Sequence, residues 1–217
     1  MNENNQLSRS ETAAALTTSF KNFNYPITFE FKISTLANDF TAKDASGNTI
    51  AYVKQKMFKL KEAINVFSDE SKLETLYTIA ADRIIDFNAC YAFKNTNGIE
   101  LGKVGRKGRK SLLKAHYEIF DKSNNLDYTI SEENPWAKVG DAVLGEIPLL
   151  GMFTGYLFNP KYIVKDTNDQ IIARLSKEPS FFGRRFKLEE VGRFKDEDGE
   201  RIMLSLMMMS LLERRRG

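Results

Sequence analysis

Cysteine, histidine and tryptophan each occur only once in this chain of 217 residues. A single cysteine, Cys90, excludes an internal disulfide framework and fits a reducing compartment. One cysteine and one histidine, His116, are too few for a zinc centre, and their positions suggest no Cys–His catalytic pair. The 29 acidic residues are too numerous for any one carboxylate pair to stand out. We therefore expect that the protein is not an enzyme.

The single histidine and the single cysteine both have structural explanations. His116 shares a strand face with Lys114 and Glu118, so we expect its side chain to be exposed. Cys90 lies in an alternating segment, where a free cysteine usually serves as a small packing residue.

A strong charge imbalance is also missing, because 32 basic residues face 29 acidic ones and leave a formal net charge of +3. This excludes a polycation that holds nucleic acid non-specifically, so any basic site has to be local. The composition, 42% hydrophobic and 28% charged, is that of an ordinary globular protein.

No basic segment followed by an apolar one opens the chain, so we expect no secretory signal and a cytoplasmic location. Residues 1–24 are polar and predict a flexible tail ahead of a single domain, residues 25–217. Two apolar segments are unsuited to crossing a membrane. The run from Ile202 to Leu212 would cover about 17 Å of the roughly 30 Å hydrocarbon layer, and residues 142–158 contain Pro148 and three glycines.

What the chain does contain is a series of short alternating segments separated by turns rich in Asp, Asn and Gly. Four pairs predict hairpins: 40–43 with 49–54, 86–94 with 98–104, 116–120 with 126–130, and 162–164 with 171–175. Further alternation occurs at 25–33, 64–67, 73–81 and 182–188. The irregular spacing excludes a propeller or a solenoid, and the pattern predicts about twelve antiparallel strands.

The last apolar run predicts a helix at about residues 199–214 that is apolar on every side. Only Ser205 and Ser210 are polar between Ile202 and Leu212, and on a helix they lie roughly 140° apart. A closed barrel of many strands leaves a cavity that such a helix can fill, whereas a two-sheet sandwich would fill its own core. We therefore predict a mainly β fold, a closed antiparallel barrel of about twelve strands around a C-terminal hydrophobic helix.

Four features resemble the tubby carboxy-terminal-like superfamily, in particular its phospholipid-scramblase and LURP-one-related branches. They are the hairpin FTAKDASGNTIAY at 40–52, its echo YIVKDTNDQIIAR at 162–174, the segment KEPSFFGRRF at 177–186, and the terminal helix. The resemblance implies a twelve-stranded barrel threaded by a hydrophobic helix, and an association with lipid. The chain lacks the proline-rich segment and the cysteine cluster of the animal scramblases, so palmitoylation of that kind is not expected.

The resemblance also implies calcium binding just before the final helix, where Asp196, Asp198 and Glu200 are the candidate ligands, with Glu189, Glu190 and Glu197 nearby. These carboxylates do not have EF-hand spacing, and their simpler interpretation is that they complement the helix dipole in a solvated loop. We expect no cofactor, with calcium at these residues as the alternative.

The most unusual polar segment is a basic cluster, defined here as Lys103, Arg106, Lys107, Arg109 and Lys110. Glycines at 102, 105 and 108 would let the backbone come close to a ligand. The cluster predicts a site for an anionic phospholipid or phosphoinositide headgroup. The alternative is a solvated loop whose charges protect a strand edge from aggregation.

The glycine spacing matches neither a P-loop nor a dinucleotide-binding loop. Residues 105–108 do spell the GXXG of KH domains, but that loop joins two helices, whereas this one follows a strand, so nucleic acid is not expected. The apolar segment 136–158 has two interpretations that the sequence leaves open. It caps the barrel as core, or it enters a membrane interface with Trp136 and Tyr156 as anchors.

These observations lead to one expectation for function and three alternatives. We expect peripheral binding of anionic phospholipid or phosphoinositide headgroups through the basic cluster, at the inner membrane face. The alternatives are a cytoplasmic protein–protein interaction module without a lipid function, a phospholipid scramblase, and RNA binding through the basic loop.

Overall fold

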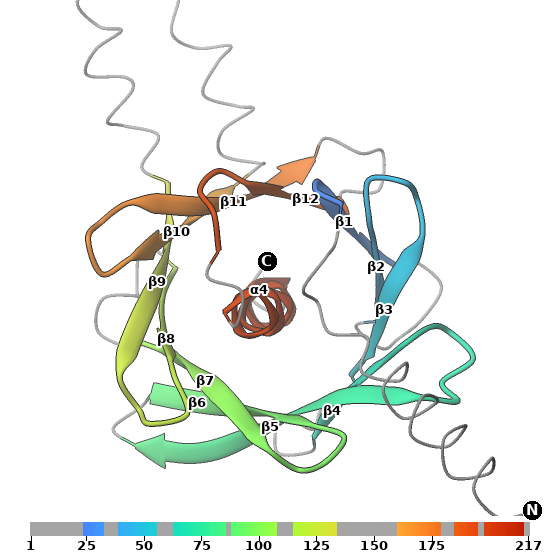
Figure 1. Cartoon of the computed structure of the whole chain (residues 1–217), viewed down its shortest axis with the longest axis horizontal. Coiled ribbons are helices and arrows are strands. Elements are labelled where there is room, and N and C mark those ends of the chain that lie inside the picture. Colours follow the sequence, from blue (N-terminus) through green and yellow to red (C-terminus); the bar gives the residue numbers. More distant parts are fainter. Residues whose placement is uncertain are drawn as a thin grey trace, which may run out of the picture.

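The computed structural model describes residues 24–32, 39–55, 63–85, 88–107, 115–133, 160–178, 185–194 and 198–214. In this part of the chain, twelve antiparallel strands close into a barrel around one helix (Figure 1). The strands are β1 (Ile27–Phe31), β2 (Phe40–Lys43), β3 (Thr49–Lys54), β4 (Ile64–Phe67), β5 (Thr75–Ile85), β6 (Asn88–Asn95), β7 (Glu100–Arg106), β8 (His116–Phe120), β9 (Leu126–Glu132), β10 (Lys161–Asp166), β11 (Ile171–Glu178) and β12 (Arg185–Glu190), and the helix is α4 (Gly199–Arg214). The predicted fold class is confirmed.

Each strand pairs with its neighbours in sequence, and β1 pairs with β12 to close the barrel. The strands predicted at 40–43, 49–54, 64–67 and 116–120 have those bounds in the structure. β5 continues to Ile85, beyond the predicted end at residue 81, because a shift in its register with β6 between Ala81 and Ile84 interrupts the alternation on which the prediction depended.

Four of the hairpin turns share one hydrogen-bonding pattern. The side-chain Oδ1 of the first turn residue accepts hydrogen bonds from the backbone N–H groups two and four positions later, and the residue three positions later has a positive φ. The first residues are Asp44, Asn95, Asp121 and Asp166, and the positive-φ residues are Gly47, Gly98, Asn124 and Asp169. This local chemistry explains why the turns were visible in the sequence.

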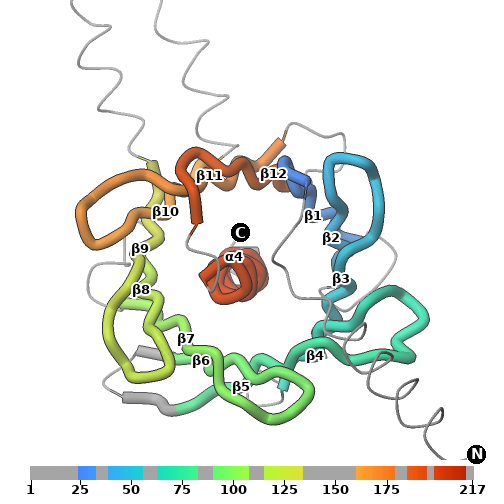
Figure 2. The backbone as a smooth tube through the Cα atoms, viewed as in Figure 1, coloured from blue at the N-terminus to red at the C-terminus, as the bar shows by residue number. Residues whose placement is uncertain are grey.

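The core of the molecule is α4 and the inner faces of the strands, which surround it on all sides (Figure 2). Every residue from Ile202 to Leu211 is at most 1% exposed. The two serines of this run donate hydrogen bonds to backbone carbonyls one turn earlier, Ser205 to Arg201 and Ser210 to Leu206, at 2.7 and 2.8 Å. Neither hydroxyl is therefore left unsatisfied in the apolar interior.

The helix direction defines two ends of the barrel. Arg201, at the start of α4, contacts Asp127 beside the turn 121–125, whereas Glu213, at its end, contacts Arg106 and Tyr117. The short hairpin turns lie at the first end, which we call the turn end. At the other end, which we call the loop end, lie the strand ends that are joined in sequence by residues outside the described ranges: 33–38, 56–62, 86–87, 108–114, 134–159 and 179–184.

Two predictions fall on residues that the structure does not describe: the flexible tail, almost all of it within residues 1–23, and the two interpretations of residues 136–158. Among the described residues, no helix has the length and apolar character needed to cross a bilayer.

Candidate anion-binding site and the polar groups around the helix

Strand alternation divides the basic cluster between two faces of the barrel. Val104 is fully buried against the core, so Lys103 and Lys107 point to the outer surface, whereas Arg106 points toward the end of α4. Arg109 and Lys110 lie outside the described residues. The consecutive residues Arg106 and Lys107 end β7 at the rim of the loop end, where the connection to β8 begins.

Lys103 lies apart from the rim, about 13 Å from Lys107 along the strand at about 3.3 Å per residue. Its ammonium group is 3.6 Å from Oδ2 of Asp82 on β5, across β6. Lys103 is thus separated from Arg106 and Lys107 along the strand and pairs with a carboxylate of its own.

Lys107 forms a hydrogen-bonded ion pair with Glu118 on the outer face of β8. Glu118 is paired in register with Gly105, which presents no side chain and leaves room for the lysine to reach across. The Glu118 side chain is only 18% exposed, whereas that of Lys107 is 42% exposed. The strand thus holds the carboxylate in place, while its cationic partner remains accessible.

Arg106 is the inward member of the rim. Its Nη2 lies 3.7 Å from Oε1 of Glu213, and its guanidinium carbon is 5.8 Å from the ring centre of Tyr117. The Tyr117 hydroxyl donates a hydrogen bond of 2.5 Å to the same Glu213 oxygen. Burial, together with this hydrogen bond, raises the pKa of Tyr117 well above its ordinary value, so the hydroxyl remains a donor.

The pairing of β7 distinguishes the two explanations of the basic cluster. Protection of a strand edge is wrong for residues 103–106, because β7 is paired with β6 on one side and with β8 on the other. An anion site is compatible with the geometry, but each described cation of the cluster already faces a carboxylate.

The expected role of the glycines is wrong for Gly102 and Gly105. Gly102 has φ of +138°, and a Cβ there would lie 2.3 Å from the Phe120 carbonyl oxygen and 2.5 Å from Cδ of Arg201. A Cβ at Gly105 would lie 3.0 Å from Sγ of Cys90. These glycines therefore accommodate the protein's own side chains, and Gly108 lies outside the described residues. Gly105 is also inside a strand, unlike the GXXG loop of a KH domain.

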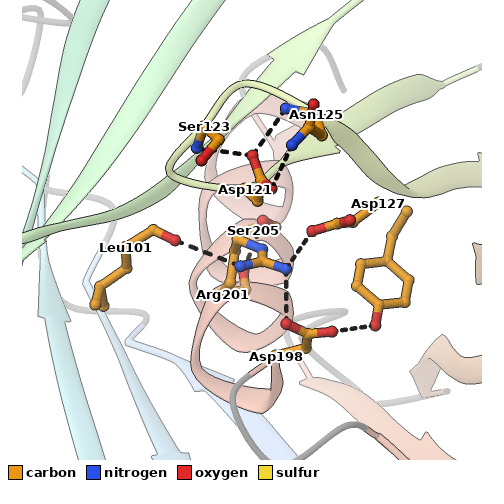
Figure 3. A network of polar contacts seen from close by, with 9 residues as sticks. Leu101, Asp121, Ser123, Asn125, Asp127, Asp198, Arg201 and Ser205 are labelled. Atoms are coloured by element: carbon orange, nitrogen blue, oxygen red, sulfur yellow. Dashed lines mark hydrogen bonds and ion pairs between the residues drawn. The ribbon is translucent and has the colours of Figure 1, made fainter.

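A second polar group lies at the turn end, around the start of α4 (Figure 3). Nη2 of Arg201 donates to Oδ1 of Asp198 at 2.7 Å and to Oδ2 of Asp127 at 2.5 Å, and Nη1 is 3.5 Å from the Leu101 carbonyl oxygen. The Tyr128 hydroxyl donates to the second oxygen of Asp198. Arg201 is 7% exposed, so these contacts compensate a charge that is almost completely removed from water.

Asp198, one of the candidate calcium ligands, is part of this network. Both carboxylate oxygens of Asp198 accept hydrogen bonds from within the protein, and its backbone carbonyl accepts the first helical bond, from Ile202. Glu200 lies in the first turn of α4, and Asp196 is outside the described residues. Within the described ranges, no three His, Cys, Asp or Glu side chains are grouped so that they could hold a metal ion.

The single histidine and the single cysteine lie on the outer face of the barrel wall, near the basic cluster. His116 shares the outer face of β8 with Glu118, as predicted, but it is half-buried rather than fully exposed. Cys90 is half-buried against Gly105, and burial raises the pKa of its thiol.

The roles of Arg201 and Glu213 were not predicted. Both sit at the ends of the apolar helix, and a charge there has to be paired if the helix is enclosed. Glu213 is the clearer signal, because a carboxylate in the last turn opposes the helix dipole unless a cation is nearby.

Comparison with known proteins adds little to this description. The sequence matches no protein family and no curated protein. A crystal structure of an Arabidopsis thaliana protein aligns with a TM-score of 0.45 at 13% identity, and the alignment covers 93% of this chain and 99% of that one.

Proposed function

We propose that this chain is a non-enzymatic protein of the tubby-like type that binds anionic phospholipid or phosphoinositide headgroups peripherally, with its loop end toward the membrane. The residues that begin the site are Arg106 and Lys107, followed in sequence by Arg109 and Lys110. The resemblance to the scramblase and LURP-one-related branches favours lipid as the source of the anion.

The observation that carries this proposal is a difference in charge between the sequences that join the strands at the two ends of the barrel. The six connections of the loop end contain eight basic and four acidic residues. The turns 44–48, 68–74, 95–99, 121–125 and 166–170 contain two basic and seven acidic residues. An anionic membrane attracts a basic surface by about 1 kcal/mol per Lys or Arg and repels an acidic one, so this distribution favours one orientation.

Composition supports the same orientation. The loop-end connections contain aromatic and aliphatic residues beside the basic ones, as in KMFKLK at 56–61, GRKSLLK at 108–114 and PSFFGR at 179–184. Segments that combine aromatic residues with Lys and Arg are typical of proteins that bind at the membrane interface.

Co-sedimentation with vesicles tests the proposal. Wild-type protein is expected to pellet with vesicles that contain anionic lipid and not with neutral ones, and replacement of all five cluster residues by Ala should abolish the difference. Equal pelleting of both proteins would refute the site. A thermal melt of the variant checks that loss of the Arg106–Glu213 contact has not unfolded it. A lipid-flip assay in reconstituted vesicles, with and without calcium, separates scrambling from binding.

A second candidate, protein–protein interaction, is favoured by the turn end. The described residues include four exposed large hydrophobic side chains, Leu73, Ile99, Leu126 and Val191, which are 91%, 57%, 42% and 51% exposed. All four lie at the turn end, and the first three are each followed by a carboxylate. A basic partner with apolar residues would fit this surface. A protein captured by the wild type and by the five-residue Ala variant, but not by a Leu73, Ile99 and Leu126 to Ser variant, would identify it.

A further inference from the structure

Two side chains on the outer face of the wall, Thr41 and Tyr52, are buried although the strand pattern points them toward solvent. The residues on either side of each, in β2 and β3, are fully buried in the core, so Thr41 and Tyr52 extend outward. The two are paired in register, and they are only 5% and 4% exposed. Other parts of the chain therefore cover this patch of the outer wall.

The turn 68–74 between β4 and β5 reaches over this patch. Oε1 of Glu70 accepts a hydrogen bond of 3.2 Å from the Thr41 hydroxyl, and Oε2 is 2.5 Å from Nζ of Lys32, which follows β1. Because β3 lies between β4 and β2, the turn has to bend over β3 to make both contacts. The same Lys32 ammonium group lies 5.1 Å from the centre of the Tyr52 ring. A carboxylate and an aromatic face thus hold one ammonium group.

A second carboxylate, that of Asp39, is buried beside the Tyr52 ring. Its Oδ2 accepts a hydrogen bond of 2.9 Å from the Tyr52 hydroxyl, and Asp39 is 3% exposed. Its Oδ1 is also buried and meets no hydrogen-bond donor among the described residues. Burial, together with the hydrogen bond to Asp39, raises the pKa of Tyr52, so its hydroxyl remains a donor. A buried carboxylate oxygen without a donor is costly, and an ammonium or guanidinium group would satisfy it.

We propose that Asp39, Tyr52 and Glu70 form a cation site that recognises a lysine or arginine side chain of a partner protein, and that Lys32 occupies this site in the isolated protein. An aromatic face flanked by carboxylates is an arrangement suited to an organic cation. Lys32 is then an internal competitor that a partner has to displace, at the effective concentration that its short tether gives it. The site is independent of the proposed lipid site, because it uses none of the basic cluster.

The turn 68–74 also offers a partner an apolar contact. Leu73 follows Glu70 by three residues in this turn and is 91% exposed, the most exposed of the large hydrophobic side chains that the described residues leave in solvent. A partner in which an apolar residue follows a basic one would contact both Leu73 and the cation site. This combination favours a protein over a free amine, and it makes the second candidate function specific for one kind of partner segment.

The test uses a blocked pentapeptide in which glycine separates a lysine from a leucine, and a second peptide with norleucine in place of the lysine. Each is titrated into the full chain, and amide NMR signals of residues 39–41, 52–53 and 68–74 are followed. Lys32→Met keeps the apolar stem and removes the internal cation. It is expected to bind the lysine peptide about fivefold more tightly than the wild type or better, the gain that one cation–π contact with its ion pair implies.

The norleucine peptide should not shift these signals in either protein. In the wild type, the lysine peptide should shift the same signals at about fivefold higher concentration, so the test does not depend on the variant alone. Asp39→Asn in the Lys32→Met background should remove the gain. The matched control in that background is Asp166→Asn, which changes the net charge equally in the turn between β10 and β11 and retains the oxygen that accepts the backbone hydrogen bonds of the turn.

Three results would each overturn the inference: no gain in affinity for the lysine peptide in Lys32→Met, equal binding of the norleucine peptide, or an equal effect of Asp39→Asn and Asp166→Asn. None of them bears on vesicle binding through the basic cluster, which the five-residue Ala variant tests separately.

Discussion

At Gly102, the side chain of Arg201 on the central helix lies against the backbone of the barrel wall. The φ of +138° at Gly102 and the position of Arg201 Cδ leave no room for a side chain. Gly102→Ala is expected to lower the free energy of unfolding by at least about 2 kcal/mol, because backbone strain and overlap add. Urea unfolding measures the change. Gly98→Ala is the control, because Gly98 also has a positive φ but open space around it, so only the strain of about 1 kcal/mol should appear.

Lys72 is the reverse case, because it is a lysine whose backbone conformation favours glycine. It has φ of 59° in the turn between β4 and β5, and its side chain is exposed. Lys72→Gly should stabilise the protein by about 1 kcal/mol, which raises the Tm of a domain of this size by about 2–4 °C. Asn124→Gly should give a smaller gain, since Asn tolerates a positive φ better than Lys. A lower Tm for Lys72→Gly would contradict this explanation.

At the residue scale, local chemistry was predictable and distant pairing was not. The turns that begin at Asp44 and Asp121 were visible because an Asp side chain bonds to backbone groups only a few residues away. The basic cluster was likewise predictable, because its members lie close together in the sequence. The contact of Arg201 with Asp127 joins residues 74 positions apart, and the partners of the cluster come from other elements. Such contacts depend on strand register, which single residues do not reveal.

At the element scale, the seam between the first and last strands is joined by Glu30 on β1. This carboxylate accepts hydrogen bonds of 2.7 Å from Lys43 on β2 and from Arg185 on β12. The hydrogen bond from Lys43, and then the charges of Lys43 and Arg185, hold the pKa of Glu30 below its ordinary value.

The lowered pKa of Glu30 has a defined effect on stability. A carboxyl group whose pKa is lower in the folded state stabilises the protein above its unfolded pKa, about 4.3, and this contribution is lost as the pH falls through the folded value. The contribution should be below about 1 kcal/mol, because the pair is partly exposed. Glu30→Gln should lower stability at neutral pH and not at strongly acidic pH. Urea unfolding at several pH values measures this, and an equal loss at every pH would refute it.

The start of α4 depends on Arg201. Replacement by Met keeps an apolar stem of similar length but leaves Asp198 and Asp127 without their shared cation. We expect Arg201→Met to lower the free energy of unfolding by about 3 kcal/mol, since breaking a buried ion pair leaves an uncompensated charge. A second variant, Arg201→Met with Asp198→Asn, should recover part of that loss. If the double variant were no more stable than the single one, the ion pair would not be the cause.

Elements with an uninterrupted pattern were predictable to the residue. The helix predicted at about 199–214 is α4, because a long run of Leu and Met without β-branched residues after Ile202 fits helix better than strand. The prediction ended β5 too early, because Arg83 stands where continued alternation from Ile79 and Ala81 required an apolar residue, and the register shift with β6 lies between Ala81 and Ile84. Irregularities of this kind come from pairing with a neighbour and leave no simple mark in a sequence.

At the scale of the whole molecule, the wall and the helix share one hydrophobic core. Eight apolar side chains of α4, from Ile202 to Leu211, are at most 1% exposed. At about 2 kcal/mol for each, their burial is comparable to or larger than the net stability of about 5–15 kcal/mol of a typical protein. The barrel is therefore expected to be unable to compensate for loss of its central helix.

Deletion of residues 201–217 should accordingly abolish cooperative unfolding rather than merely lower the Tm. Without α4, inner-face residues such as Phe29, Phe93 and Tyr117, all fully buried in the intact protein, would line a cavity wide enough to admit water. The measurement is a thermal melt followed by near-ultraviolet circular dichroism, which detects fixed aromatic packing. The control removes only residues 215–217, which follow α4, and should melt cooperatively. A cooperative melt of the longer deletion would mean that the strands fill the barrel in another way, and the central-helix explanation of the fold would be wrong.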